Sequence, residues 1–224
     1  LFRKLDNYAL KIIDQIVVNS DELKEYLINS RGIQENKIKV IYHFSSSEES
    51  PRPENYNKEI IYTGNLGIPQ NIESFIKNLN KSTDQYKLKI YGSGSRYEDI
   101  KKMESENINV NPYTDRSEIL KHTKNSTFAL VSLSSSLTVE GFPGKTFDYL
   151  KMNKILIGYS NPLSGLARFI EKYNVGINID PENPNIDSAF KDLKNLDEIY
   201  QNIEDVNLKY ANLNTVSQQY LSLL

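Results

Sequence analysis

The sequence predicts an α/β protein with a doubly wound, Rossmann-like parallel sheet. Two observations indicate this fold. Short runs rich in β-branched and aromatic residues alternate with helical patterns along the chain, and the connections between them are short. Strands that alternate with helices in this way pair in parallel, and the helices cover both faces of the sheet. Ligands bind such sheets at the carboxyl ends of the strands, so the loops after residues 64, 92, 113, 134 and 159 are expected to share one edge and to hold the functional site.

The first elements expected are a strand over 16–20, a helix over 21–30 and a strand over 38–44. Ser20 can cap this helix, and two acidic residues in its first turn suit the positive end of the helix dipole. The segment 45–57, SSSEESPRPENYN, shows no hydrophobic period and contains two prolines and many serines. It is therefore predicted to be a linker.

A second, longer series of strands and helices follows the linker. Each strand leads through a short loop to the next helix, which is the pattern of a parallel sheet. The expected strands are 59–64, 86–92, 108–113, 127–134, 154–159 and 175–180. The expected helices are 71–79, 97–104, a segment capped by Thr114 or Asp115, 144–152, a segment within NPLSGLARFIEKY, and an amphipathic helix over 214–224.

Composition excludes several classes of function. With 27 basic and 29 acidic residues the net charge is -2, which argues against a general nucleic-acid binder. The absence of cysteine excludes disulfides and thiolate metal sites, and the presence of only two histidines, His43 and His122, excludes a histidine-rich metal centre. No apolar run approaches the roughly 18 residues needed to span a bilayer. The chain begins with Leu1 rather than Met, so it is expected to be a fragment.

Two glycine turns follow expected strands. Gly64, Asn65, Leu66 and Gly67 form a Gly-x-x-Gly turn between a strand and a helix, where glycine lets the main chain approach a ligand and free N–H groups can face a phosphate. The same pattern is also typical of an ordinary turn. The run YGSGS (91–95) resembles part of a dinucleotide fingerprint, but it lacks the third glycine and the ribose-binding acid, so a tight turn is the better interpretation.

The stretch VEGFPGKTFDYLKMNK (139–154) places two carboxylates and a lysine around a glycine turn that opens a helix. Main-chain N–H groups of residues 144–146 together with the Lys145 ammonium would form an anion site. Asp148, in the first helical turn, could accept hydrogen bonds from the hydroxyls of a ligand held by its phosphate, and Glu140 would lie on the other side of that phosphate. This layout suits a sugar–diphosphate–ribose ligand. The alternative is that Glu140 is a solvated acid in a loop, that Lys145 is a surface cation, and that Asp148 only complements the helix dipole.

The spacing of Glu140 and Asp148, with GFPGKTFDYL between and after them, resembles the E-x7-E signature of retaining GT-B glycosyltransferases of the GT4 type, the glycosyl transferases group 1. The run VVNSDELKEYLINSRGIQENKIKVIYHF resembles the end of the N-terminal lobe in that group. Later runs, among them IIYTGNLG, LKIYGSGS and NKILIGYSNPLSGLARFIEKYNVGINIDPEN, resemble successive elements of its nucleotide-binding lobe. The likeness covers nearly the whole chain.

The resemblance implies a division of the chain into four parts. Residues 1–44 would be the end of the N-terminal acceptor lobe, 45–57 the linker and 58–200 the nucleotide-sugar-binding lobe. Residues 201–224 would be helices that cross back toward the N-terminal lobe. The acceptor-binding residues of the N-terminal lobe are not in this chain, and His43 and His122 are expected to be structural or exposed to solvent.

The resemblance also implies roles for individual residues. Glu140 would contact the donor sugar and Asp148 the ribose hydroxyls, while Lys145 supplies positive charge for the phosphates. The diphosphate would be held by the turn from Gly64 to Gly67 and by the N–H groups of Phe142 to Thr146, a segment that follows Gly141 and includes Pro143 and Gly144. Tyr113 and Thr114 would border the base.

The chain departs from the family pattern at two places. Asp148 is one methylene shorter than the usual Glu, and the basic residues that often follow the first glycine loop are missing from GNLGIPQN, so that Lys145 would replace them.

The expected function is donor binding in a retaining hexosyltransferase. The enzyme would move a sugar from a nucleoside-diphosphate sugar to a glycan or lipid-linked acceptor in bacterial surface polysaccharide biosynthesis. No metal or other cofactor is implied, because no DxD-like pair is present and the positive site can neutralise the leaving diphosphate. The protein would be cytoplasmic, with possible contact at the inner face of the membrane, and this chain alone is expected to be inactive.

Two alternative functions remain open at this point. One is a non-catalytic nucleotide-sugar-binding subunit that works beside a partner chain. The other is a GT-B sugar-nucleotide epimerase, which would need further acidic and histidine residues that the sequence does not show.

Overall fold

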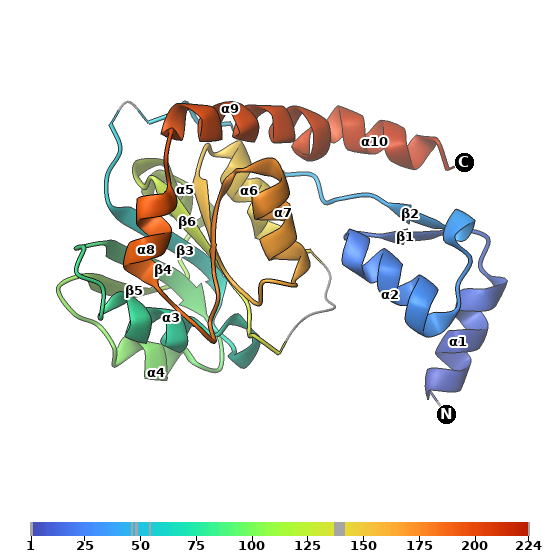
Figure 1. The fold of residues 1–224 in the computed structure, drawn as a ribbon, viewed down its shortest axis with the longest axis horizontal. Helices are drawn as coiled ribbons and strands as arrows, with labels where there is room; N and C mark the ends of the chain where they lie inside the picture. Colours follow the sequence, from blue (N-terminus) through green and yellow to red (C-terminus); the bar gives the residue numbers. More distant parts are fainter. Residues whose placement is uncertain (1, 46, 48, 54, 137–141, 224) are drawn as a thin grey trace.

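The computed structural model describes residues 2–45, 47, 49–53, 55–136 and 142–223 (Figure 1). Its centre is a six-stranded parallel sheet made of β3 (Glu59–Asn65), β4 (Lys87–Ser93), β5 (Ile108–Pro112), β6 (Phe128–Ser132), β7 (Ile155–Tyr159) and β8 (Gly176–Ile179). The strand order is β5-β4-β3-β6-β7-β8. The chain therefore first builds the sheet outward on one side of β3 and then on the other, which is the doubly wound arrangement that the sequence predicts.

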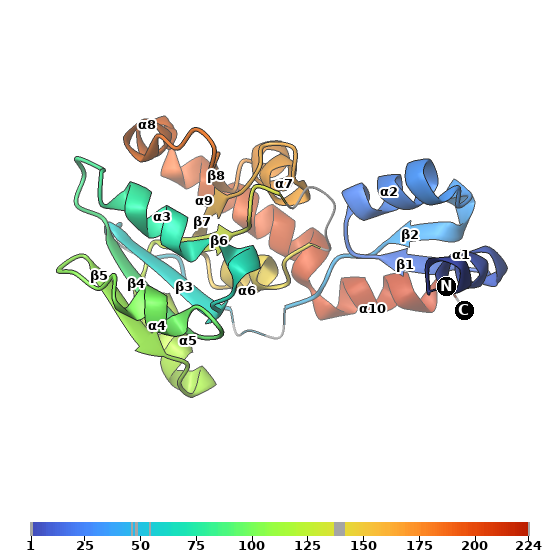
Figure 2. The ribbon, with the colours of Figure 1, turned by 90° about the horizontal axis from the view of Figure 1, so that it is seen from below.

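Helices cover both faces of this sheet (Figure 2). Tyr159 and Thr63 point to opposite faces, because side chains alternate along strands and the pairing register relates the two positions. On one face α3 (Ile72–Leu79) packs on β7, where the Tyr159 hydroxyl bonds to Ser74 at 2.8 Å. On the other face α6 (Lys145–Lys151) packs on β3, where the Tyr149 hydroxyl accepts from the Thr63 N–H at 2.8 Å.

The remaining helices of the larger unit follow the expected alternation. The β strands are fully buried on both sides at the centre of the sheet, which explains their continuous apolar sequences. The helices are α4 (Tyr97–Lys101), α5 (Arg116–Asn125), α7 (Gly165–Tyr173), α8 (Ile186–Asp192), α9 (Leu196–Val206) and α10 (Leu213–Leu221), with a π-helical segment, Asn207–Ala211, between the last two and a 3-10 turn, Ile68–Gln70, before α3.

A smaller unit precedes the large sheet. It contains α1 (Phe2–Ile12), β1 (Ile16–Val18), α2 (Asp21–Arg31), a 3-10 turn (Glu35–Lys37) and β2 (Ile38–Val40), and β1 pairs with β2 in parallel. Ser20 caps α2 as predicted, since its hydroxyl accepts from the Leu23 N–H at 3.0 Å. The sequence did not indicate α1, and the strand expected over 38–44 ends at Val40.

Tyr42 joins the two units. Its ring meets the rings of Phe142, Phe147, Phe169 and Tyr210 with centroid distances between 5.3 and 5.8 Å. These are edge-on contacts, the geometry that aromatic pairs prefer. The segment after it is packed rather than free, because Ser45, Ser47 and Ser50 are buried. Both views show α10 extending from the large unit toward the smaller one (Figures 1 and 2), and on it Val216 is buried whereas Tyr220 and Leu221 are exposed.

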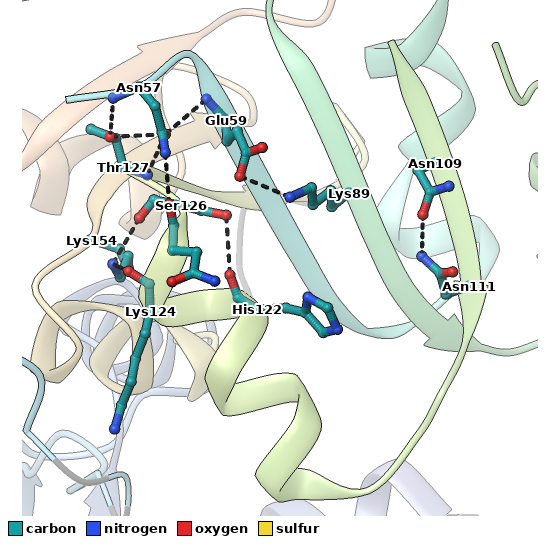
Figure 3. Close-up of polar contacts among 11 residues, drawn as sticks. Asn57, Glu59, Lys89, Asn109, Asn111, His122, Lys124, Ser126, Thr127 and Lys154 are labelled. Carbon is teal, nitrogen blue, oxygen red and sulfur yellow. Dashed lines mark hydrogen bonds and ion pairs between the residues drawn. The ribbon is translucent and has the colours of Figure 1, made fainter. Parts of the chain in front are cut away.

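Polar side chains fix the amino edge of the large sheet (Figure 3). The Asn57 carboxamide oxygen accepts from the Glu59 N–H and from both the N–H and the hydroxyl of Thr127, and so ties β3 to β6. Lys154 is fully buried, and its ammonium donates to the carbonyl oxygens of Lys124 and Ser126 at 2.9 and 2.7 Å. These two bonds satisfy carbonyls that the end of α5 leaves without helical partners. Burial lowers the pKa of Lys154 to about 8.

Candidate functional site

The predicted turn at Gly64–Gly67 and the predicted turn before α6 lie at the same carboxyl edge of the sheet. The chain winds away from β3 toward β4 in its first half and toward β6 in its second, so the point where the winding reverses lies between β3 and β6. Open α/β sheets bind ligands at this point. Gly64 lies near the carboxyl end of β3, and the segment that follows β6 leads into α6 with Lys145, so both predicted turns lie beside this point.

Lys145 connects these two turns directly. Its ammonium donates to the Thr63 carbonyl oxygen at 3.0 Å and lies 4.1 Å from the centre of the Tyr62 ring. Gly64 has φ +125, and a Cβ at this position would lie 3.1 Å from the Lys145 Nζ, so glycine leaves room for the ammonium. Burial lowers the pKa of Lys145 to about 8. Among the described residues no carboxylate pairs with this ammonium, which lies at the carboxyl end of β3.

The remainder of the first turn is mainly structural. Leu66 is fully buried and its N–H donates to the Ser93 carbonyl at 2.8 Å, so its side chain belongs to the core and its N–H is bonded within the chain. Its predicted contact with the donor stays a prediction. The Gly67 N–H donates to the Gln70 carboxamide oxygen at 3.1 Å, and the Asn65 side chain donates to the same oxygen at 3.2 Å. A Cβ on Gly94 would lie 2.4 Å from the Leu66 carbonyl, which confirms the tight-turn interpretation of that glycine.

The prediction that the N–H groups from Phe142 to Thr146 are free is wrong for Phe142, Pro143 and Thr146. The Phe142 N–H donates to the Asn19 carboxamide oxygen at 3.3 Å, Pro143 has no N–H, and the Thr146 N–H donates to the Pro143 carbonyl at 3.0 Å. Among the described residues, no acceptor is positioned for the N–H groups of Gly144 and Lys145. The Thr146 hydroxyl is buried and has no hydrogen-bond partner within the described part of the chain.

Asp148 lies on α6 and already accepts two hydroxyl hydrogen bonds. The Ser45 Oγ donates to its Oδ1 at 2.7 Å and the Ser47 Oγ donates to the same atom at 3.0 Å. Both serines belong to the segment predicted as a linker. A carboxylate at this position can therefore bind hydroxyl groups, which is the chemistry predicted for it, but here the hydroxyls come from the chain itself.

The other predicted site residues either lie apart from Lys145 or fall outside the residues that the structure describes. Tyr113 is exposed and Thr114 donates to Glu118 at 2.6 Å; both follow β5, the edge strand two places from β3. Glu140 and Gly141 lie outside the described residues. A groove of about 650 Å³ lies between α7, β8 and α8 and is lined by Asn178 and Asp180 among others. It is at the edge of the sheet opposite to β5.

Two residues of the smaller unit were missed by the sequence analysis. The Asn19 side chain contacts the Phe142 main chain, and its Nδ2 lies 2.8 Å from the His43 Nε2. His43 is exposed, and its Cδ2 lies 3.8 Å from the position of a Cβ on Gly144. The sequence signalled neither contact, because 24 residues separate Asn19 from His43 and 123 separate it from Phe142.

Comparison with known proteins shows the family to which the chain belongs. Residues 44–208 match the family model of the glycosyl transferases group 1, which is most of the chain. The chain belongs to this family. Over 150 residues it is 29% identical to the O-antigen biosynthesis glycosyltransferase WbnH of Escherichia coli, and equally to the probable O-antigen biosynthesis glycosyltransferase WbiN of the same organism. This group 1 chain spans 43% of the length of each of these relatives, and the matched region is 65% of the chain.

Solved structures share its fold at low sequence identity. An S. aureus TarM mutant in complex with fondaparinux, alpha-GlcNAc-glycerol and UDP matches with a TM-score of 0.72 at 19% identity, over 98% of this chain and 46% of that one. Anabaena HepE in complex with UDP and glucose matches with a TM-score of 0.73 at 14% identity, over 99% of this chain and 66% of that one. The likeness confirms the predicted Rossmann-like fold of GT-B glycosyltransferases.

Two features are absent from the described residues. No helix among them combines the length and the apolar character needed to cross a membrane. Within the same part of the chain, no group of three or more histidine, aspartate or glutamate side chains could hold a metal ion.

Proposed function

We propose that this chain is the donor-binding part of a retaining glycosyltransferase. The enzyme transfers a hexose from a nucleoside-diphosphate sugar to a glycan or lipid-linked acceptor in bacterial surface polysaccharide biosynthesis. It works without a metal, in the cytoplasm at the inner face of the membrane, and this chain alone transfers nothing because the acceptor is held by a further lobe. Glu140 contacts the donor sugar and Asp148 the ribose.

The observation that carries the proposal is the position of Lys145. Its ammonium lies at the carboxyl end of β3, bonded to the Thr63 carbonyl and packed against Gly64, where the winding of the sheet reverses. A ligand phosphate at this strand end would meet a cation that no carboxylate of the described residues neutralises. In group transfer from a diphosphate the negative charge grows on the leaving group, so a fixed cation there stabilises the transition state.

The relatives support the class of substrate and the biological setting. The structural neighbours TarM and HepE are described with UDP, and HepE also with UDP-glucose. The two Escherichia coli relatives act in O-antigen biosynthesis. The family and the Lys145 geometry together favour a nucleoside-diphosphate sugar as donor and a surface glycan as product.

Isothermal titration of UDP, GDP and their sugars into the chain tests the donor site. The wild-type chain is expected to bind at least one of them, and Lys145→Met is expected to weaken that binding by about tenfold or more, the effect of losing a charge-assisted hydrogen bond. Lys151→Met, at the other end of α6, is the matched control and is expected to change affinity by less than about twofold. Equal affinity of wild type and Lys145→Met would refute the proposed site.

Retention is tested in the full-length protein. NMR of the product is expected to show the anomeric configuration of the donor sugar. A full-length protein that binds the donor but transfers nothing would instead be the non-catalytic subunit, and an inverted product would contradict the retaining mechanism.

A further inference from the structure

The side-chain amide of Asn19 holds the main chain of the turn before α6. Asn19 lies between β1 and α2 in the smaller unit. Its Nδ2 donates to the Phe142 carbonyl oxygen at 3.3 Å, and its Oδ1 accepts from the Phe142 N–H at 3.3 Å. This pair of bonds fixes the orientation of the amide, because a flipped amide would place donor against donor and acceptor against acceptor.

The fixed amide also determines the protonation of His43. Nδ2 of Asn19 can only donate, and it lies 2.8 Å from the His43 Nε2. That nitrogen must therefore accept, so the imidazole is neutral and carries its proton on Nδ1. The ring is placed beside the same turn, with Cδ2 3.8 Å from the position of a Cβ on Gly144.

The Phe142 side chain is held from the same side. Its ring lies 5.3 Å from that of Tyr42, the residue before His43, and 4.8 Å from that of Phe169. The smaller unit thus fixes both the ring and the main chain of Phe142, three residues before Lys145. Because well-placed binding groups depend on such support, a loose turn would shift the lysine that meets the donor.

We propose that Asn19 and His43 are positioning residues for the donor site: they clamp the turn at Phe142–Gly144 and so couple the smaller unit to donor binding. The inference rests on the proposed function, because its effect is read on the nucleotide. Neither residue needs to touch the donor. The clamp requires an acceptor at position 43 and an amide at position 19.

The first test measures UDP affinity by calorimetry, with GDP in parallel. Asn19→Ala is expected to weaken binding about tenfold, the effect of losing the two hydrogen bonds that hold the Phe142 main chain. Asn29→Ala, an exposed asparagine on α2, is the matched control and is expected to bind like wild type. His43→Gln keeps an acceptor and is expected to retain most of the affinity, whereas His43→Phe fills the space without one and is expected to lose it.

The second test is spectroscopic and does not depend on nucleotide. Side-chain nitrogen shifts of the two histidines are recorded in alkaline buffer, and His43→Gln assigns the signals. Wild type is expected to show His43 as the Nδ1–H form, and Asn19→Ala is expected to move it toward the Nε2–H form. A merely structural loss of packing would not move this equilibrium.

The outcomes separate the two proposals. If wild type binds nucleotide and Asn19→Ala binds equally well, the clamp is refuted while the donor site stands. If wild type shows His43 as the Nε2–H form, the clamp is refuted whatever the affinity. If wild type binds no nucleotide, the proposed function fails and the role of the clamp in donor binding fails with it, even where the Nδ1–H form is observed.

Discussion

The two units of the molecule are stabilised in different ways. The core of the large unit runs through all six strands and the helices on both faces, with residues such as Ile61, Leu156 and Phe147 fully buried. The core of the smaller unit, among the described residues, consists of Val18, Leu27, Ile33 and Ile38 with a few half-buried neighbours. A two-stranded sheet of this size is marginal alone. The smaller unit therefore depends on its contacts with the large one.

The comparison is tested most directly by removing a buried side chain from each core in turn. Phe147→Ala, in the large unit, is expected to lower the free energy of unfolding by about 3–5 kcal/mol, because it leaves a cavity in a closed core. Leu27→Ala, in the smaller unit, is expected to destabilise that unit by about 2–4 kcal/mol and to unfold it locally. Urea unfolding gives the first value. Hydrogen exchange resolves the second, with loss of protection expected in β1, α2 and β2 only; loss across the large sheet would contradict the account.

Cutting the link between the units should have the next largest effect. Tyr42→Ala removes four aromatic contacts and is expected to cost about 2–3 kcal/mol, seen as faster exchange in the smaller unit. Tyr42→Phe removes only the hydrogen bond to Asp21 at 3.1 Å and is expected to cost about 1 kcal/mol or less. Equal effects of the two variants would show that the hydroxyl, not the ring, joins the units.

Lys154 is expected to make the stability of the large unit depend on pH. Its folded-state pKa of about 8 lies below that of an unfolded lysine, about 10.4. Between these values the unfolded chain binds more protons at this lysine, so Lys154 should make the stability of the large unit rise with pH, by about 2 kcal/mol from pH 8 to 10. The buried Lys145 ammonium, whose pKa is also about 8, should add a similar rise. Urea unfolding across this range tests the sign. Lys154→Met is expected to reduce the rise by about 2 kcal/mol and exposed Lys194→Met to leave it unchanged; a rise unchanged in Lys154→Met would contradict the assignment.

Lys145 gives the smallest effect, and it is read on nucleotide binding. Its pKa of about 8 means that the ammonium loses its charge as pH rises through 8, while a bound diphosphate favours the charged form. UDP affinity is therefore expected to fall by about fivefold to tenfold from pH 7 to 9. Calorimetry at several pH values measures this. Lys145→Met should bind weakly at every pH, and a pH-dependent affinity in that variant would assign the titration to another group.

The sequence predicted the large unit better than the smaller one, for a physical reason. Strands buried on both faces, such as 128–132 and 155–159, are continuous apolar runs and are visible without a structure. The helix α1 shows an exposed apolar stripe at Leu5, Tyr8 and Ile12 instead, and the sequence analysis did not recognise it. The fold class and nearly every element after residue 58 followed from the pattern of alternation.

The candidate site was predictable only where it is local. The shared edge of the two turns followed from the parallel sheet, whereas the contact of Lys145 with Gly64 was not predicted. The bonds of Ser45 and Ser47 to Asp148, and of Asn19 to Phe142, join segments more than 100 residues apart, and no spacing in the sequence signals them. The free N–H groups were overpredicted because the main-chain partners of a turn depend on its conformation.

The most direct measurement of the central claim is a crystal structure of the chain with UDP bound. The account predicts the diphosphate at the carboxyl end of β3, with a phosphate oxygen within hydrogen-bond distance of the Lys145 Nζ and beside Gly64, and the ribose toward Asp148. A nucleotide bound elsewhere, for example in the groove beside β8, with the Lys145 ammonium still bonded only to Thr63, would contradict it.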